Sequence, residues 1–193
     1  TAFRADVSKR RYADWGELMH YCRYSAMPVG RFVLDLHGED RSVWGYSDPL
    51  CSALQVINHL QDCAADYRDL NRVYLPLDAM RACGASVQEL GATKSSPPLR
   101  ACLKSIAERT AGLLLKASKL PLAVKDTRLG LETGAIVRLA QRLTALLITR
   151  DPLSERVHLS KPTALANGMQ GVAATLAARL TRHSDFPRPG QGR

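Results

Sequence analysis

Residues Leu50 to Pro76, LCSALQVINHLQDCAADYRDLNRVYLP, guide the interpretation of the whole sequence. The stretch places Asp62 and Asp66 four residues apart, which is about one turn of a helix. At about 100° per residue, five polar side chains fall within about 100° of arc, while the opposite side is apolar. The five are Gln55, Asn58, His59, Asp62 and Asp66. We therefore expect a helix that packs through one face and presents a polar stripe on the other.

The two aspartates of this stripe have the spacing of a metal-binding pair. Carboxylates one turn apart lie about 6 Å from each other and repel, so the pair is stabilised when a cation lies between them. Mg²⁺ binds through one or two carboxylates, keeps several waters and shares its remaining positions with substrate phosphates. We predict that Asp62 and Asp66 bind Mg²⁺ together with a diphosphate. The alternative is solvated surface charge, the commoner origin of such spacing.

Features around the pair favour the metal site. The amides of Gln55 and Asn58 extend the acidic stripe by two turns, and no lysine or arginine interrupts it. Basic residues follow only afterwards, at Arg68 and Arg72. His59 borders the stripe, but beside carboxylates that suit Mg²⁺ we expect it to line the pocket and not to bind the metal.

Two motifs in this order resemble a known family. The run Gln55-x-x-Asn58-x-x-x-Asp62-x-x-x-Asp66, followed by Arg72-Val-Tyr-Leu-Pro76, resembles the second aspartate-rich motif of the squalene and phytoene synthases, the head-to-head prenyl synthases. Upstream, the segment from Tyr21 to Arg31, YCRYSAMPVGR, is similar to their tyrosine-cysteine helix. Its Ser-Ala-x-Pro-Val-Gly-Arg form is most similar to the bacterial hopanoid-pathway branch, which forms hydroxysqualene. The resemblance covers roughly residues 12–161.

The resemblance implies an enzyme with an all-α, isoprenoid-synthase-like helical bundle. It implies a prenyl diphosphate substrate, presqualene diphosphate or farnesyl diphosphate, bound through Mg²⁺ at Asp62 and Asp66. The substrate ionises with loss of diphosphate, and the hydroxysqualene branch then captures water. Tyr21 is implied as a catalytic residue of the carbocation pocket. The implied substrate-binding residues are Gln55, Asn58, Arg72, Tyr74, Arg156 and Lys161.

Alternatives remain for several of these residues and for the function. From the residues alone, Tyr21 is a core aromatic whose hydroxyl finds a local partner, and Arg156 and Lys161 are ordinary surface charges. The first aspartate-rich motif of the family has no counterpart before the tyrosine-cysteine helix, so we expect an N-terminally incomplete bundle that is inactive by itself. The alternative functions are a non-catalytic assembly or scaffold protein of the same fold, and a phytoene or squalene synthase that uses two prenyl diphosphates.

Charge and cysteine content narrow the class of protein. Twenty-seven Lys and Arg against 18 Asp and Glu give a net charge of +9, which suits an anionic partner. We expect no nucleic-acid partner, because no nucleic-acid-binding motif occurs. The five cysteines form no Cys-x-x-Cys pair, which indicates reduced thiols in a cytoplasmic protein. No run of about 18 apolar residues occurs, so any membrane contact is expected to be peripheral.

The hydrophobic pattern predicts a single helical domain over residues 1–181 and a disordered basic tail over residues 182–193. Asp14 begins a helix that extends to Leu36 and is broken near Ser25 by Pro28. The aspartate helix is expected to begin at Ser47-Asp48-Pro49 and to continue to about Tyr67. Further helices are expected over residues 78–83, from 86, and over 99–117, 136–147 and 163–180.

Overall fold

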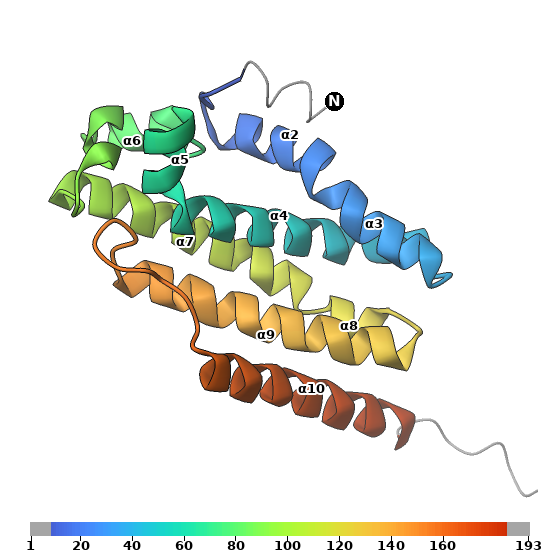
Figure 1. The fold of residues 1–193 in the computed structure, drawn as a ribbon. Helices are drawn as coiled ribbons and strands as arrows, with labels where there is room; N and C mark the ends of the chain where they lie inside the picture. The colour runs from blue at the N-terminus through green and yellow to red at the C-terminus, as the bar shows by residue number, and fades with distance from the viewer. Residues whose placement is uncertain (1–8, 185–193) are drawn as a thin grey trace, which may run out of the picture.

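The computed structural model describes residues 9–184, which form a bundle of helices, as predicted (Figure 1). In chain order the first seven helices of this part are α2 (Trp15–Ser25), α3 (Met27–Leu36), η1 (Arg41–Val43), α4 (Trp44–Gln61), α5 (Cys63–Leu70), α6 (Leu77–Ala82) and η2 (Val87–Gly91). They are followed by α7 (Pro97–Ala117), α8 (Leu120–Ala123), α9 (Thr127–Thr149) and α10 (Lys161–Ser184). Figure 1 shows α2 and α3 lying over α4, with α7, α9 and α10 stacked below in that order.

The first helical segment starts and breaks where the sequence predicts. Asp14 caps α2 by accepting a hydrogen bond from the Glu17 backbone nitrogen at 2.8 Å. The break at Ala26 lies two residues before Pro28, whose ring disfavours helical geometry upstream. Gly38, with φ +66, follows the end of α3 and adopts the left-handed conformation that glycine tolerates best.

Helix α4 begins at Trp44, so the prediction of a start at Ser47-Asp48-Pro49 is wrong. Asp40 caps the preceding 3-10 turn by accepting from the Ser42 backbone nitrogen at 2.8 Å, and that turn leads directly into α4. Asp48 is then already helical and accepts from Arg31 Nε at 2.9 Å, which ties α4 to α3. The helix therefore begins upstream of Pro49, and this proline lies inside it and not in its first turn.

The aspartate segment is also not one helix up to Tyr67, as predicted, but two helices that meet at Asp62. Asp62 has φ −101 and ψ 6, outside ideal helical values. Hydrogen bonds from Asp62 N to Asn58 O and from Asp66 N to Asp62 O continue across the junction, so the chain bends without unwinding. Beyond the bend, α5 packs against η2, a tertiary contact that hydrophobic periodicity does not reveal.

The later helices follow the predicted pattern with shifted ends. The capping box at Ser86 and Glu89 is present, although the turn it starts is a 3-10 helix. Helices α9 and α10 approach closely at Gly134 and Gly171, where an added Cβ on Gly171 would lie 2.4 Å from the Gly134 carbonyl oxygen. Helix α10 extends through Ser184, so residues 182–184 of the predicted tail are helical, and residues 185–193 lie outside the described part.

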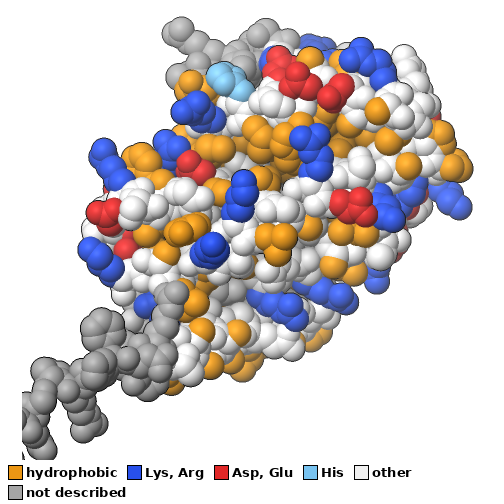
Figure 2. All heavy atoms as spheres, turned by 180° about the vertical axis from the view of Figure 1, so that it is seen from behind, with side chains coloured by type: hydrophobic (Ala, Val, Ile, Leu, Met, Phe, Trp, Pro, Cys, Tyr) orange, Lys and Arg blue, Asp and Glu red, His pale blue; other side chains and the backbone are white. Residues whose placement is uncertain are grey.

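Several apolar side chains remain on the surface of this bundle. On α3 and α10 they include Val29, Phe32, Leu36, Leu165, Met169, Leu176 and Leu180. The view from behind in Figure 2 shows Lys and Arg side chains scattered among hydrophobic ones, without one continuous basic patch on that face. No helix in residues 9–184 is both long and apolar enough to cross a membrane. The five cysteines are free thiols, and Cys22, Cys63 and Cys102 are buried, as expected of packing residues.

Candidate functional site

The two aspartates of the polar stripe flank the bend between α4 and α5. Asp62 occupies the junction itself, and Asp66 lies in the first turn of α5, where the helix dipole favours a negative charge. Burial, followed by the nearby charge of Asp62, nevertheless raises the pKa of Asp66 to about 6, while the positive charge of Arg72 opposes the shift. The two carboxylates therefore repel in a half-buried setting, which a bound cation would relieve.

Arg72 is brought back beside this pair by a tight turn. Asn71 ends α5 in the left-handed conformation with φ 49, and the Arg72 backbone nitrogen donates to the Asp66 carbonyl oxygen at 2.9 Å. Arg11 holds the turn from outside, since its guanidinium donates to Asn71 Oδ1 at 2.6 Å and its backbone forms a parallel bridge with Val73. A guanidinium next to two carboxylates suits a ligand that carries both metal and phosphate.

Asp62 and Asp66 fit an Mg²⁺ ion that a diphosphate binds at the same time. Asp62 and Asp66 supply hard oxygen atoms, and among residues 9–184 there is no group of three or more His, Cys, Asp or Glu side chains that could hold a metal. Mg²⁺ commonly binds through one or two carboxylates and completes its shell with water and phosphate oxygen atoms. The described residues thus fit an ion that a diphosphate also binds, and do not fit a cage made of protein alone.

Four buried rings pack together beside the acidic pair and form the aromatic cluster. It consists of Tyr12, Tyr21, His59 and Tyr74. His59 stacks on Tyr74 with 3.5 Å between ring centroids and 9° between ring planes. Tyr74 stacks in turn on Tyr12 at 5.4 Å, and Tyr21 lies 5.4 to 6.1 Å from the other three rings. The cluster joins the start of the chain, α2, α4 and the loop after α5.

This cluster brings several of the predicted residues together. Tyr21, 8% exposed, packs with Tyr74, and Gln55 Nε2 lies 3.1 Å from His59 Nε2. Asp62 follows His59 by three residues, so Tyr21 contacts the face of α4 that leads to the acidic pair and not the opposite side. The expectation of a core aromatic is met at Tyr21, whereas its part in a carbocation pocket stays a prediction.

The remaining predicted residues have no contact with the aromatic cluster among the described interactions. Asn58 is exposed on α4, one turn before Asp62. Arg156 is exposed, but its neighbour Val157 accepts a hydrogen bond from Gln61 Nε2 at 2.5 Å, which fixes this loop beside the end of α4. Lys161 is the exposed first residue of α10, and no described hydrogen bond or ion pair joins it to Asp62 or Asp66.

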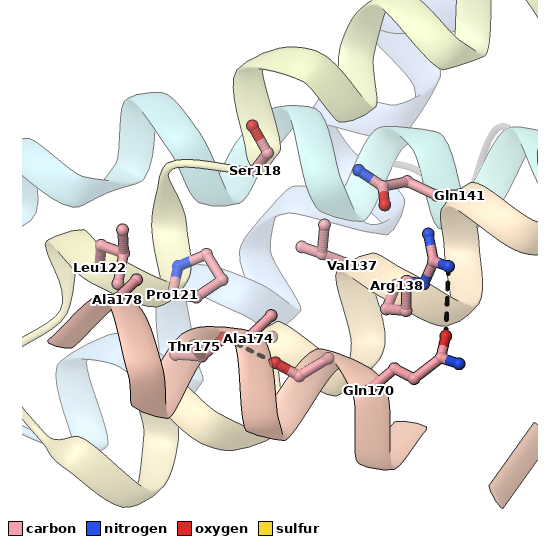
Figure 3. Close-up of a pocket in the computed structure, with 12 residues that line it drawn as sticks. Ser118, Pro121, Leu122, Val137, Arg138, Gln141, Gln170, Ala174, Thr175 and Ala178 are labelled. Atoms are coloured by element: carbon pink, nitrogen blue, oxygen red, sulfur yellow. Dashed lines mark hydrogen bonds between the residues drawn. The ribbon is translucent and has the colours of Figure 1, made fainter. Parts of the chain in front are cut away.

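A separate cavity of about 440 Å³ opens between α8, α9 and α10 (Figure 3). Figure 3 shows Arg138 on α9 pointing toward Gln170 on α10, with a hydrogen bond of 3.2 Å between them. The lining also includes small residues such as Gly134, Gly171 and Ala174 and larger ones such as Leu122 and Val137. None of the predicted site residues lines it, so it is distinct from the acidic pair.

Sequence reasoning missed two members of the site region. His59 was expected as a pocket wall, whereas it is 6% exposed and stacked inside the aromatic cluster. Its spacing of four from Gln55 was the available signal, because such pairs face each other on a helix. Tyr12, 1% exposed, gave no signal, since its stacking partner Tyr74 lies 62 positions later.

Comparison with known proteins gives a consistent group of relatives. A family model for squalene/phytoene synthase matches residues 1–163. Proteins named hydroxysqualene synthase from Rhodopseudomonas palustris and Sinorhizobium fredii are 60% and 54% identical over 82% and 93% of this chain. The chain spans 54% and 61% of those relatives, little more than half their length.

Solved structures agree with the fold. The crystal structure of squalene synthase HpnC from Alicyclobacillus acidocaldarius is similar, with 28% identity and a TM-score of 0.64. The match covers 96% of this chain and 58% of the HpnC chain. A dehydrosqualene synthase in complex with ligand matches 92% of this chain and 62% of its own with a TM-score of 0.79. At 20% identity this second likeness concerns the fold alone.

Proposed function

The chain belongs to the squalene/phytoene synthase family, and on that premise we propose that the full gene product is a hydroxysqualene synthase. In this reaction presqualene diphosphate ionises, diphosphate leaves, and water is captured by the rearranged carbocation. The observation that carries the proposal is the repelling Asp62–Asp66 pair beside Arg72, in a chain 54–60% identical to proteins of that name. A phytoene synthase from Thermus thermophilus is 35% identical over 52% of the chain, a weaker likeness.

Each residue of the site has a defined part in this proposal. Asp62 and Asp66 would hold Mg²⁺, and the bound ion would supply positive charge to the departing diphosphate. Arg72 pairs with a phosphate oxygen, and its position beside Asp66 supports that part. Gln55 and Asn58 bind the same ligand farther along α4, on the same stripe.

The aromatic residues contribute an environment without bulk water. Tyr21 and Tyr74 belong to a packed cluster next to the stripe, so the wall they form is preorganised before substrate binds. Arg156 and Lys161 complete the phosphate-binding set. The position of Arg156 beside Gln61 and the end of α4 supports its inclusion more directly than that of Lys161.

The described chain contains one pair of carboxylates for a leaving group with several negative charges. The loss of one well-placed stabilising group typically costs about 10²- to 10³-fold in rate. We therefore propose that the 193-residue chain does not turn over presqualene diphosphate at a useful rate by itself. The anionic, lipid-like substrate and the free cysteines support a cytoplasmic enzyme with peripheral membrane contact.

The test compares the full gene product with the 193-residue chain. Each is incubated with presqualene diphosphate and Mg²⁺, and the extracted lipid is identified by mass spectrometry. We expect hydroxysqualene from the full product only. Parallel incubations contain NADPH in addition, or two prenyl diphosphates in place of presqualene diphosphate. Squalene in the first or phytoene in the second would assign another branch of the family. No product from the full protein would favour a scaffold of the same fold, and efficient turnover by the short chain would contradict our view of the metal site.

A further inference from the structure

His59 links the polar stripe of α4 to the aromatic cluster. Its ring is 6% exposed, stacks on Tyr74 at 3.5 Å with 9° between planes, and lies 6.1 Å from Tyr21. A ring held in this way cannot turn without displacing Tyr74, which is itself stacked on Tyr12. Packing therefore fixes the plane of the imidazole ring, and in this plane Nε2 is the nitrogen that faces Gln55.

One nitrogen of this fixed ring meets the side chain of Gln55. The two Nε2 atoms lie 3.1 Å apart, and because an amide nitrogen can only donate, His59 Nε2 accepts the hydrogen bond. The neutral ring then carries its proton on Nδ1. Burial lowers the pKa of His59 to about 3, so this acceptor persists at neutral pH. The bond leaves the carbonyl oxygen as the end of the Gln55 amide that is turned away from the ring.

We propose that His59 is a positioning residue that orients the Gln55 amide so that its oxygen atom faces the ligand. Gln55 lies seven residues before Asp62, about 10 Å along the helix, and it is half-buried at the edge of the stripe. This inference rests on the proposed function, in which the ligand is a diphosphate with hydrated Mg²⁺. A carbonyl oxygen accepts hydrogen bonds from the waters of such an ion. An amide nitrogen only donates, and the hydrogen atoms of those waters would point at it.

The tautomer of His59 tests the geometry independently of any activity. Long-range ¹H–¹⁵N NMR spectra of histidine-labelled protein, assigned with a His59→Phe variant, report which ring nitrogen carries the proton. We expect an unprotonated Nε2 and a protonated Nδ1, with no titration between about pH 5 and pH 8. A proton on Nε2 would mean that the amide of Gln55 is reversed, and it would overturn the proposal.

Kinetics of the full gene product then test the positioning role. His59→Phe retains a ring to stack on Tyr74 but removes the acceptor, and Gln55→Leu removes the amide. Loss of such a supporting contact typically costs about 10- to 100-fold in metal affinity or activity. We expect each single variant to lower kcat/KM by about that factor at an unchanged melting temperature. The double variant should be no worse than the poorer single one, because the two residues act as a unit.

Two outcomes separate the inference from the function on which it rests. Full activity of His59→Phe, or losses that multiply in the double variant, would contradict a positioning role. If the wild-type protein makes no product, the proposed function fails. Calorimetry of inorganic diphosphate with Mg²⁺ on the same variants then decides the positioning role, with equal affinity for wild type and His59→Phe counting against it.

Discussion

The aromatic cluster and the acidic pair are neighbours, because His59 of the cluster lies on α4 three residues before Asp62, yet the two regions differ in burial and charge. In the cluster, four rings are packed to between 1% and 8% exposure, and His59 stays neutral because burial lowers its pKa. At the pair, Asp66 is half-buried with its pKa raised to about 6 beside a second carboxylate. The cluster is held together by ring packing within the protein. The pair places two carboxylates in repulsion, which a bound cation would relieve, and such perturbed groups are typical of binding sites.

The largest effect on stability is expected in the cluster. Tyr74→Ala removes a ring that contacts Tyr12, Tyr21 and His59, so it should lower the free energy of unfolding by about 3–5 kcal/mol. Urea denaturation followed by circular dichroism measures this change. The matched control is Tyr24→Ala, whose ring is 47% exposed and should cost less than about 1 kcal/mol. Equal losses for both tyrosines would show that the cluster is not a stabilising unit.

At the acidic pair we expect the opposite pattern, a large loss of function without loss of stability. Asp62→Asn removes a predicted Mg²⁺ ligand, and the full gene product should lose about 10²- to 10³-fold in kcat/KM. Its unfolding midpoint should stay the same or rise, because a repulsion with Asp66 is removed. Asp35→Asn, at an exposed position of α3, serves as the control and should retain activity. A similar loss of kcat/KM in both variants would show that Asp62 has no specific role in the reaction.

A smaller effect concerns the pH dependence of stability. The folded-state pKa of Asp66, about 6, lies above its ordinary value of 3.8, so the folded protein holds this proton more tightly than the unfolded chain. The contribution of Asp66 to stability is therefore greatest below about pH 4 and falls as pH rises to about 6. Because the side chain is half-exposed, we expect a loss of only about 1 kcal/mol.

The difference between wild type and Asp66→Asn isolates this contribution from those of the other carboxyl groups. Urea unfolding of both proteins between about pH 4 and pH 7 should show wild type losing stability relative to the variant as pH increases. A constant difference across this range would mean that Asp66 titrates normally and that the pair is not under repulsion.

The sequence predicted those parts of the fold that depend on local chemistry. Asp14 and Glu17 mark the start of α2, and Pro28 marks the break before α3, because capping and proline geometry act over a few residues. The start of α4 was misplaced because Ser47-Asp48-Pro49 was taken as the local start signal, whereas the 3-10 turn capped by Asp40 leads into the helix at Trp44. The bend at Asp62 was missed because α5 turns to pack on η2, which depends on tertiary contacts.

The site divides in the same way. Helical spacing proposes Gln55, Asp62 and Asp66 as one polar stripe, since side chains three, four or seven positions apart share a face, and their part in binding stays a prediction. The burial of Tyr21 and the stack of His59 on Tyr74 could not be found in this way, because the two rings of that stack are 15 positions apart and meet only when the loop after α5 folds back. Sequence spacing therefore proposes candidate ligands, while the bend that separates them into α4 and α5 and the rings that pack beside them depend on the tertiary fold.

Isothermal titration calorimetry of the 193-residue chain shows whether Asp62 and Asp66 bind Mg²⁺ jointly with a diphosphate. Mg²⁺ is titrated with and without inorganic diphosphate into wild type, Asp62→Asn, Asp66→Asn and the control Asp35→Asn. We expect weak Mg²⁺ binding alone, marked strengthening by diphosphate in wild type and in the control, and loss of that synergy in the two site variants. Micromolar affinity for Mg²⁺ without diphosphate, or synergy that survives both site substitutions, would contradict the claim.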